Sequence, residues 1–236
     1  MDPYHRAFVD VLHSLENAAR TAGRPHAGQP SGVRLLAVSK TQPVEAIAAL
    51  AGLGQRAFGE NYVQEAAGKI AALAGRGLEW HLIGHLQSNK AREAARDFDW
   101  VQTVDRPKLA TALARHRPDD LAPLNVLLQV NIDDEAGKHG CRPDELTALA
   151  EAVAAEPRLA LRGLMAIPAP HADPEWRRPA FRRMRELFER LRENHPQADT
   201  LSMGMSEDFA IAIAEGATMV RIGSAIFGAR DKKPSA

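Results

Sequence analysis

The sequence of 236 residues contains one cysteine, Cys141, so no disulfide can form within the chain. A lone cysteine fits a protein of the reducing cytoplasm. The first twenty residues lack the apolar core of a secretory signal. No apolar run reaches the roughly 18 residues that a membrane-spanning helix needs. These absences predict a cytoplasmic protein without a membrane segment.

Net charge is absent as well, because 30 basic side chains balance 30 acidic ones. A neutral chain offers no general attraction to nucleic acid or to an anionic membrane. The stretch 174–194 is rich in arginine, and a basic nucleic-acid face is one interpretation of it. Spacings such as Arg182–Glu186 and Arg185–Glu189 favour ion pairs on a solvated helix face instead. We therefore expect neither nucleic acid nor membrane as a partner.

Metal-binding motifs are also missing, since the chain has no HExxH pattern and no cysteine cluster. His81 and His85 are four residues apart, as in helical metal pairs, but WHLIGH is typical of a strand followed by glycine. Two histidines at this spacing along a strand would not converge on one ion. We expect no metal site, a His81 that is packed or partly exposed, and a His85 that lines a pocket.

The pattern that is present is a regular alternation of two periodicities. Short apolar runs lie at residues 33–38, 56–58, 80–83, 100–104, 124–130, 159–167, 199–203 and 218–222. Helical spacing fills the stretches 43–53, 61–74, 88–96, 106–116, 142–155, 174–194 and 206–214. Strands that alternate with helices indicate parallel βαβ units. Eight such units in a chain of this length are typical of a closed barrel.

These patterns predict an α/β protein, a single (β/α)8 TIM barrel over residues 1–236, with an extra N-terminal helix at 4–21. That helix and a loop would occupy residues 1–32, and residues 229–236 would form a short polar tail. An open doubly wound sheet is the alternative. Its glycine fingerprint is missing after the first apolar run, where Val38-Ser39-Lys40-Thr41 has no glycine.

Lys40 lies one residue past the end of the first predicted strand, in the string AVSKTQP. Residues at the carboxyl ends of barrel strands build the functional site of this fold. A lysine that faces a pocket there loses hydration, and burial favours its neutral amine. Because a neutral amine attacks aldehydes, Lys40 is a candidate Schiff-base lysine.

Glycine and serine follow the last two predicted strands in a repeated design. Gly204 and Ser206 follow the seventh strand, and Gly223 and Ser224 follow the eighth. Glycine permits close backbone approach to a ligand, and serine is a favoured helix N-cap, so Ser206 would cap the next helix. Helix N-termini attract anions, and the loops after strands seven and eight are the usual phosphate site of this barrel. We therefore expect a phosphate group there.

Arg221 lies within an otherwise apolar strand, MVRIG. Its guanidinium needs an acceptor, which could be a carboxylate or a cofactor. Barrel closure would place the eighth strand beside the first, and Arg221 near Lys40. A phosphate cradle, a lysine at a strand end and a ring partner together describe a pyridoxal phosphate (PLP) site. An arginine at the pyridine nitrogen would leave the ring unprotonated and a weaker electron sink.

Seven ordered segments between residues 35 and 228 carry a family resemblance. They are AVSKT (37–41), FGENYVQE (58–65), WHLIGHLQSNK (80–90), QVNIDDEAGKHGC (129–141), GLMAI (163–167), SMGMSEDFAIAI (202–213) and VRIGSAIFG (220–228). Together they resemble the pyridoxal phosphate homeostasis proteins (the YggS/PROSC family), whose fold is similar to the barrel domain of alanine racemase.

The resemblance implies a role for each residue of the candidate site. Lys40 would form the internal aldimine with PLP, and Arg221 would face the pyridine nitrogen. Asn61 and Met203 would line the ring. The phosphate would be held by three further residues, Ser206, Gly223 and Ser224. Many members have threonine where Ser224 stands, and the hydroxyl is kept.

Three functions remain open for such a site: a PLP carrier or regulator without turnover, an amino-acid racemase of low activity, and an aldolase-like enzyme. A racemase needs two bases, and the second is a tyrosine from another domain in alanine racemases. Only Tyr4 and Tyr62 exist here, and the chain ends about ten residues after the last glycine loop. We therefore expect a non-catalytic monomer that binds PLP for PLP homeostasis, with no catalytic residues and with PLP-requiring apoenzymes as recipients.

Overall fold

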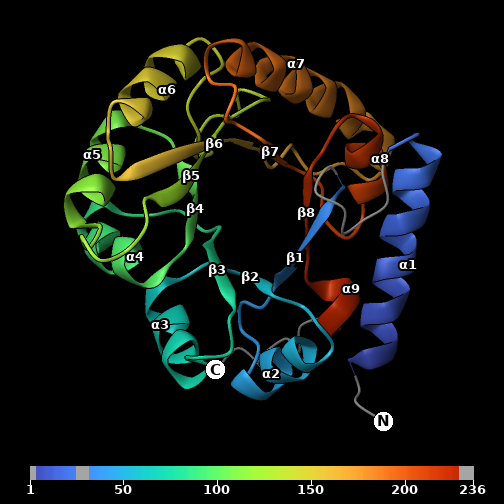
Figure 1. The fold of residues 1–236 in the computed structure, drawn as a ribbon. Helices are drawn as coiled ribbons and strands as arrows, with labels where there is room; N and C mark the ends of the chain where they lie inside the picture. The colour runs from blue at the N-terminus through green and yellow to red at the C-terminus, as the bar shows by residue number, and fades with distance from the viewer. Residues whose placement is uncertain (1–3, 25–31, 229–236) are drawn as a thin grey trace.

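The computed structural model describes residues 4–24 and 32–228. Within them, eight parallel strands pair in sequence order and close into a barrel, with β1 beside β8 (Figure 1). The strands are β1 (Arg34–Val38), β2 (Ala57–Glu60), β3 (Glu79–Leu82), β4 (Trp100–Val104), β5 (Leu124–Gln129), β6 (Leu159–Met165), β7 (Thr200–Ser202) and β8 (Met219–Ile222). The predicted (β/α)8 barrel is confirmed, and the open doubly wound sheet is wrong.

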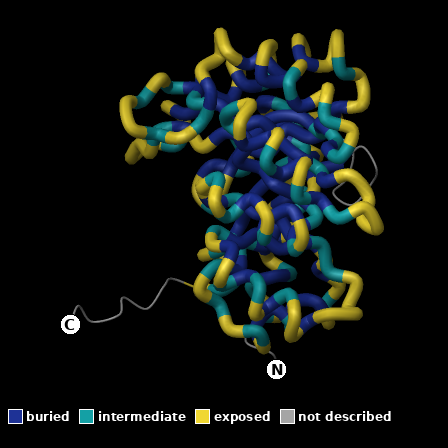
Figure 2. Tube along the Cα trace, turned by 90° about the vertical axis from the view of Figure 1, so that its left-hand side faces the viewer, coloured by how far each residue is buried: buried dark blue, intermediate teal, exposed yellow. Residues whose placement is uncertain are grey.

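Helices form an outer ring around the strands (Figure 1). The α-helices are α1 (His5–Thr21), α2 (Val44–Gly52), α3 (Val63–Ala72), α4 (Ala91–Asp97), α5 (Pro107–His116), α6 (Leu146–Ala154), α7 (Arg178–Asn194), α8 (Phe209–Ala214) and α9 (Ser224–Phe227). Two 3-10 turns, η1 (Ser88–Lys90) and η2 (Pro174–Arg177), precede α4 and α7. Figure 2 shows the buried backbone at the centre and exposed turns at the periphery. None of the described helices is long and apolar enough to cross a membrane.

The helix α1 lies outside the βα repeat and packs against α8 and α9 (Figure 1). Its buried residues recur at helical spacing, as an amphipathic helix requires: Phe8, Val11, Leu15 and Ala19. This confirms the extra N-terminal helix predicted over residues 4–21. Part of the predicted loop, residues 25–31, and the predicted tail, residues 229–236, lie outside the described residues.

The strand β2 extends two residues beyond the apolar run that predicted it. All four of its residues are buried, including the charged Glu60 at its end. Lys69 on α3 donates hydrogen bonds to both carboxylate oxygens of Glu60, at 2.9 and 3.0 Å. A buried carboxylate is tolerated only with such a partner, and the partner is nine residues away in sequence. The apolar run alone therefore predicted the end of this strand two residues too early.

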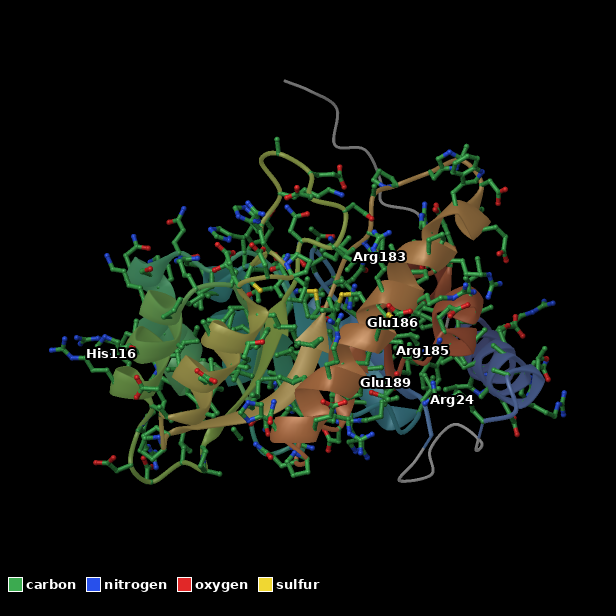
Figure 3. The ribbon with its side chains drawn as sticks, turned by 90° about the horizontal axis from the view of Figure 1, so that it is seen from above. Arg24, His116, Arg183, Arg185, Glu186 and Glu189 are labelled. Atoms are coloured by element: carbon green, nitrogen blue, oxygen red, sulfur yellow. The ribbon has the colours of Figure 1, made fainter. Side chains whose placement is uncertain are left out.

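The arginines in the first half of α7 are paired with acidic side chains, on this helix and beyond it. The residues of α7 that Figure 3 labels are Arg183, Arg185, Glu186 and Glu189. Arg185 contacts Glu189 at 3.7 Å, as expected. The expected partner of Arg182, Glu186, is replaced by Glu215, which follows α8 and lies 3.5 Å from the Arg182 guanidinium. Glu215 also contacts Arg178 and Arg185. These ion pairs offset the positive charge of the helix and favour the solvated-face interpretation over a nucleic-acid surface.

Candidate functional site

A cavity of about 550 Å³ lies at the carboxyl ends of the strands. This is the end where barrels of this fold carry their sites, and the volume suits a small organic ligand. The residues singled out in the sequence that line it are Lys40, Asn61, Ser206, Arg221, Gly223 and Ser224. Apolar walls come from Val38, Ile83, Ile167, Pro168 and Phe227. The cavity therefore joins a polar set of side chains to an apolar wall, as a flat aromatic ligand requires.

Lys40 lies in a tight turn that follows β1 and is half-buried. The turn is closed by a hydrogen bond from the Gln42 N–H to the Ser39 carbonyl at 3.0 Å. Thr41 has a φ of 65°, a left-handed conformation that is unfavourable for a β-branched residue. Its N–H donates to the Glu65 carboxylate at 2.6 Å, which holds this conformation. Strain of this kind persists only where the surroundings enforce it, and here it adjoins Lys40.

A buried ion network lies behind the turn and fixes its backbone. The Lys69 ammonium donates to the Ser39 carbonyl at 2.8 Å, to Glu65 at 2.7 Å and to both oxygens of Glu60. The Ser39 hydroxyl donates to Glu60 at 2.6 Å. Burial raises the pKa of Glu60, and the bonds from Ser39 and Lys69 oppose that rise. Sequence reasoning missed this network, although the Glu65–Lys69 spacing is that of a helical ion pair.

Two serine hydroxyls meet at the end of the cavity formed by the loops after β7 and β8. The Ser206 and Ser224 Oγ atoms are 3.2 Å apart. Gly223 precedes α9, and a Cβ atom at this position would lie 3.1 Å from the Val38 carbonyl oxygen. That spacing is tight, so glycine lets the loop pack close to β1. The two loops thus present hydroxyls and backbone N–H groups of a kind that binds phosphate.

The predicted helix cap at Ser206 is wrong. The helix α8 begins at Phe209, and its N-cap is Asp208. The Asp208 carboxylate accepts a hydrogen bond from the Met205 N–H at 2.6 Å and one from Arg177 at 2.7 Å. The Ser206 hydroxyl accepts a hydrogen bond from the Ser224 hydroxyl instead.

Arg221 is almost fully buried, with 3% of its surface exposed. Its guanidinium donates to the Ser202 carbonyl at 2.8 Å, to the Ser202 hydroxyl at 2.7 Å and to the Ala166 carbonyl at 2.8 Å. Within the described chain, no carboxylate is among these acceptors. Burial lowers the pKa of Arg221 to about 10, so the group remains a cation at neutral pH. A buried cation that lines the cavity without a hydrogen-bonded anion favours an acceptor atom on a ligand.

A chain of hydrogen bonds connects Arg221 with the interior of the barrel. The Ser202 hydroxyl donates to the Gln102 side chain at 2.7 Å, and the Gln102 amide lies 2.9 Å from Nδ1 of His81. Burial lowers the pKa of His81, which favours a neutral ring whose Nε2 donates to Glu79 at 2.6 Å. Of the two expectations for His81, packed or partly exposed, the structure shows the packed one, and the His81 ring orients the Gln102 amide that bonds to Ser202.

Two of the predicted site residues lie outside the lining of this cavity, as the described residues define it. Met203 is fully buried and its N–H bonds to the Met219 carbonyl at 3.1 Å, whereas Met205 lines the cavity. His85 is exposed, and its ring stacks on that of His139 with centroids 3.5 Å apart. Burial and the nearby charge of His139 lower the pKa of His85. The structure thus places His85 beside His139 and outside the lining of the cavity.

Neither tyrosine lines the cavity in the described part of the chain. Tyr62 precedes α3 and is 61% exposed. Tyr4 packs against Phe227, with ring centroids 5.8 Å apart. Lys138 lines the cavity although the sequence did not single it out for the pocket. It is held by an ion pair with Glu135 in the loop after β5.

The closed barrel, with its lysine after β1 and its cavity at the carboxyl ends of the strands, matches a known class of protein. A family model described as the N-terminal domain of alanine racemase matches residues 11–231. Alanine racemase from Corynebacterium glutamicum shares the fold, with a TM-score of 0.64 over 96% of this chain and 62% of that chain. The identity there is 19%, so this likeness concerns the fold alone.

Curated relatives define the family more narrowly. The pyridoxal phosphate homeostasis protein of Pseudomonas aeruginosa is 55% identical over 95% of this chain and 94% of its own length. That of Escherichia coli is 52% identical over 95% of each chain. The structure of PipY from Synechococcus elongatus with PLP bound is 36% identical, with a TM-score of 0.77 over 92% of this chain and 100% of that one. The chain belongs to the family of pyridoxal phosphate homeostasis proteins.

Proposed function

We propose that this protein binds PLP in the cavity at the carboxyl ends of the strands and serves PLP homeostasis without substantial turnover. The observation that carries the proposal is the meeting of Lys40, Arg221 and the Ser206–Ser224 pair around one cavity. PLP supplies an aldehyde that a lysine amine captures as an imine, with release of water. Relatives that share more than half of the sequence are named for PLP homeostasis, and PipY has PLP bound.

The residues present fit each part of this cofactor. The hydroxyls of Ser206 and Ser224 and the backbone at Gly223 would hold the phosphate. Arg221, a buried cation with spare donor capacity, would donate to the pyridine nitrogen. Asn61 and the apolar wall would flank the ring. Lys40 would bind the aldehyde carbon.

The side chains around the cavity favour binding over catalysis. A racemase needs a second base on the opposite face of its substrate, and neither tyrosine of this chain lines the cavity. Arg221 holds its proton at neutral pH, so a ring nitrogen beside it would stay unprotonated and withdraw electrons weakly. Ser224 is exposed, which leaves the phosphate end open to solvent. We infer that the cavity gives up its cofactor to apoenzymes that require PLP.

A titration of the purified protein with PLP tests this proposal. We expect one PLP per chain, with a visible absorbance band that is lost in Lys40→Ala. The control is Lys138→Ala, which removes another amine from the same cavity and should keep the band. The same samples are incubated with single enantiomers of amino acids and analysed by chiral chromatography. If the wild-type protein interconverts the enantiomers and Lys40→Ala does not, the protein is a racemase and the carrier proposal is wrong.

A further inference from the structure

Three potential metal ligands meet beside the cavity, on loops that follow neighbouring strands. They are His85 after β3, Asp105 after β4 and His139 in the loop after β5. Each offers one ligand atom, and these atoms all lie within 4.8 Å of one another. In the part of the chain that the structure describes, no other group of histidine, cysteine and acidic residues meets this condition.

The donor set has the chemistry of a site for zinc or a similar ion. Two imidazoles and a carboxylate are ligands that Zn²⁺ prefers, at bond lengths of about 2.0–2.2 Å. Ligand atoms around a tetrahedral ion at those lengths are about 3.4 Å apart. Because the present separations reach no more than 4.8 Å, small rotations of the two exposed histidine side chains would bring the three ligand atoms closer to this spacing. A harder ion such as Mg²⁺ would prefer oxygen ligands throughout.

Both histidines are held by a backbone that is itself fixed. The Gly84 carbonyl, next to His85, accepts a hydrogen bond from the Thr103 hydroxyl at 2.9 Å. The His139 carbonyl accepts one from the Gln129 side chain at 3.2 Å. The two imidazole rings are stacked at 3.5 Å with an angle of 10° between their planes. The rings are thus brought together by ordered backbone, which lowers the entropy cost of binding an ion.

Gly140 makes the approach of the His139 loop possible. Its φ is 123°, and a Cβ atom there would lie 2.5 Å from the Asn131 nitrogen. The loop then returns to β5, where the Cys141 N–H bonds to the Gln129 carbonyl at 2.9 Å. Any other residue at position 140 would clash with the backbone at Asn131, so this loop could not keep its present path.

The Asp105 carboxylate can still bind a metal ion although it is paired with a cationic neighbour, Arg106. Its Oδ1 atom is paired with Arg106, whose other nitrogen is 3.2 Å from the Leu86 carbonyl and from the Ser88 hydroxyl. A carboxylate has two oxygens and about four acceptor positions, so the pair with Arg106 leaves room for a metal bond. Arg106 also orients the carboxylate, as outer-shell partners of metal ligands do.

We propose that His85, Asp105 and His139 bind one divalent transition-metal ion of the zinc class, with solvent completing the coordination. The site is separate from the proposed PLP cavity, and its three ligands come from loops after β3, β4 and β5. Lys138 lines the cavity and adjoins His139, so the two sites share one loop.

Competition titration with a chromophoric zinc chelator tests the proposal on tag-free, chelator-treated full-length protein. We expect one Zn²⁺ per chain, and a loss of affinity of at least about tenfold in His85→Ala and in His139→Ala. His13→Ala removes an exposed imidazole from α1 and should leave the affinity unchanged. Both ligand histidines are exposed, so unchanged circular dichroism should show that the variants fold.

Binding of Co²⁺ gives a second readout that does not depend on the chelator. Visible absorption of four-coordinate Co²⁺ should appear in the wild-type protein and in Lys40→Ala, and should vanish in His139→Ala. The Lys40→Ala sample separates this test from the PLP proposal, because that variant would lack bound cofactor. Absence of Zn²⁺ binding, or equal binding by all three histidine variants and the wild type, would overturn the proposal in favour of adventitious surface binding.

Discussion

Replacement of Lys69 with methionine should strongly destabilise the barrel. The ammonium donates to both Glu60 oxygens, at 2.9 and 3.0 Å, and to the Ser39 carbonyl at 2.8 Å. Methionine is one atom shorter than lysine and otherwise keeps the unbranched shape of the side chain, without its charge. Glu60 is fully buried, so its carboxylate would keep only the hydrogen bond from the Ser39 hydroxyl. Removal of one partner from a buried ion pair costs about 3–5 kcal/mol.

That free energy corresponds to a large change in the melting temperature. For a chain of this size, 1 kcal/mol changes Tm by about 2–4 °C. Lys69→Met should therefore lower Tm by about 6–20 °C, measured by calorimetry at neutral pH without PLP. The matched control is Lys69→Met combined with Glu60→Gln, which removes the buried charge. The double variant should be more stable than Lys69→Met alone, because no fully buried charge remains at position 60.

The pH dependence of the same variant has a definite sign. Burial already raises the pKa of Glu60, and loss of Lys69 removes a group that opposes the rise. The folded state would then hold a proton that the unfolded state releases, so stability falls as pH rises through this range. The deficit of Lys69→Met relative to wild type should shrink as pH is lowered towards the pKa of Glu60. A Tm within 2 °C of wild type, or a deficit that grows on acidification, would refute the reasoning.

Two further predictions concern the phosphate end and the barrel interior. Ser206→Ala and Ser224→Ala should each weaken PLP binding by about 2- to 13-fold in equilibrium titrations, since one hydrogen bond contributes about 0.5–1.5 kcal/mol. If the double variant binds PLP with unchanged affinity, the phosphate does not bind at these two serines. Gln102→Leu should lower the free energy of unfolding by about 1–3 kcal/mol in urea, because Ser202 and His81 each lose a buried partner. Equal stability of Gln102→Leu and wild type would show that the chain of hydrogen bonds contributes nothing.

The barrel could be predicted because its evidence is local in sequence. Each strand is a short apolar run and each helix a separate periodic stretch, so the alternation indicates parallel βαβ units directly. Lys40 could be placed for the same reason, since the end of a strand is also the end of its apolar run. The position of Arg221 followed from barrel closure, and both residues line the same cavity.

Contacts between distant segments could not be predicted in the same way. Glu60 interrupts an apolar pattern, and only its pair with Lys69 explains why β2 continues through it. His85 was expected in the pocket because it follows a strand, whereas its ring meets His139 from a loop two strands further along the barrel. Ser206 has the sequence features of a helix cap, but the Asp208 and Phe209 N–H groups bond to the Met205 carbonyl, and α8 begins only at Phe209. Contacts of this kind leave no periodic signal.

The most direct test of the central claim is to locate the bound cofactor on the chain. Borohydride reduction of the PLP-loaded protein makes the lysine–cofactor bond permanent, and peptide mass spectrometry then identifies the modified residue. The account predicts a single modified lysine, Lys40, with modification lost in Lys40→Ala. Modification of Lys138 in the wild-type protein, or of no lysine at all, would contradict it.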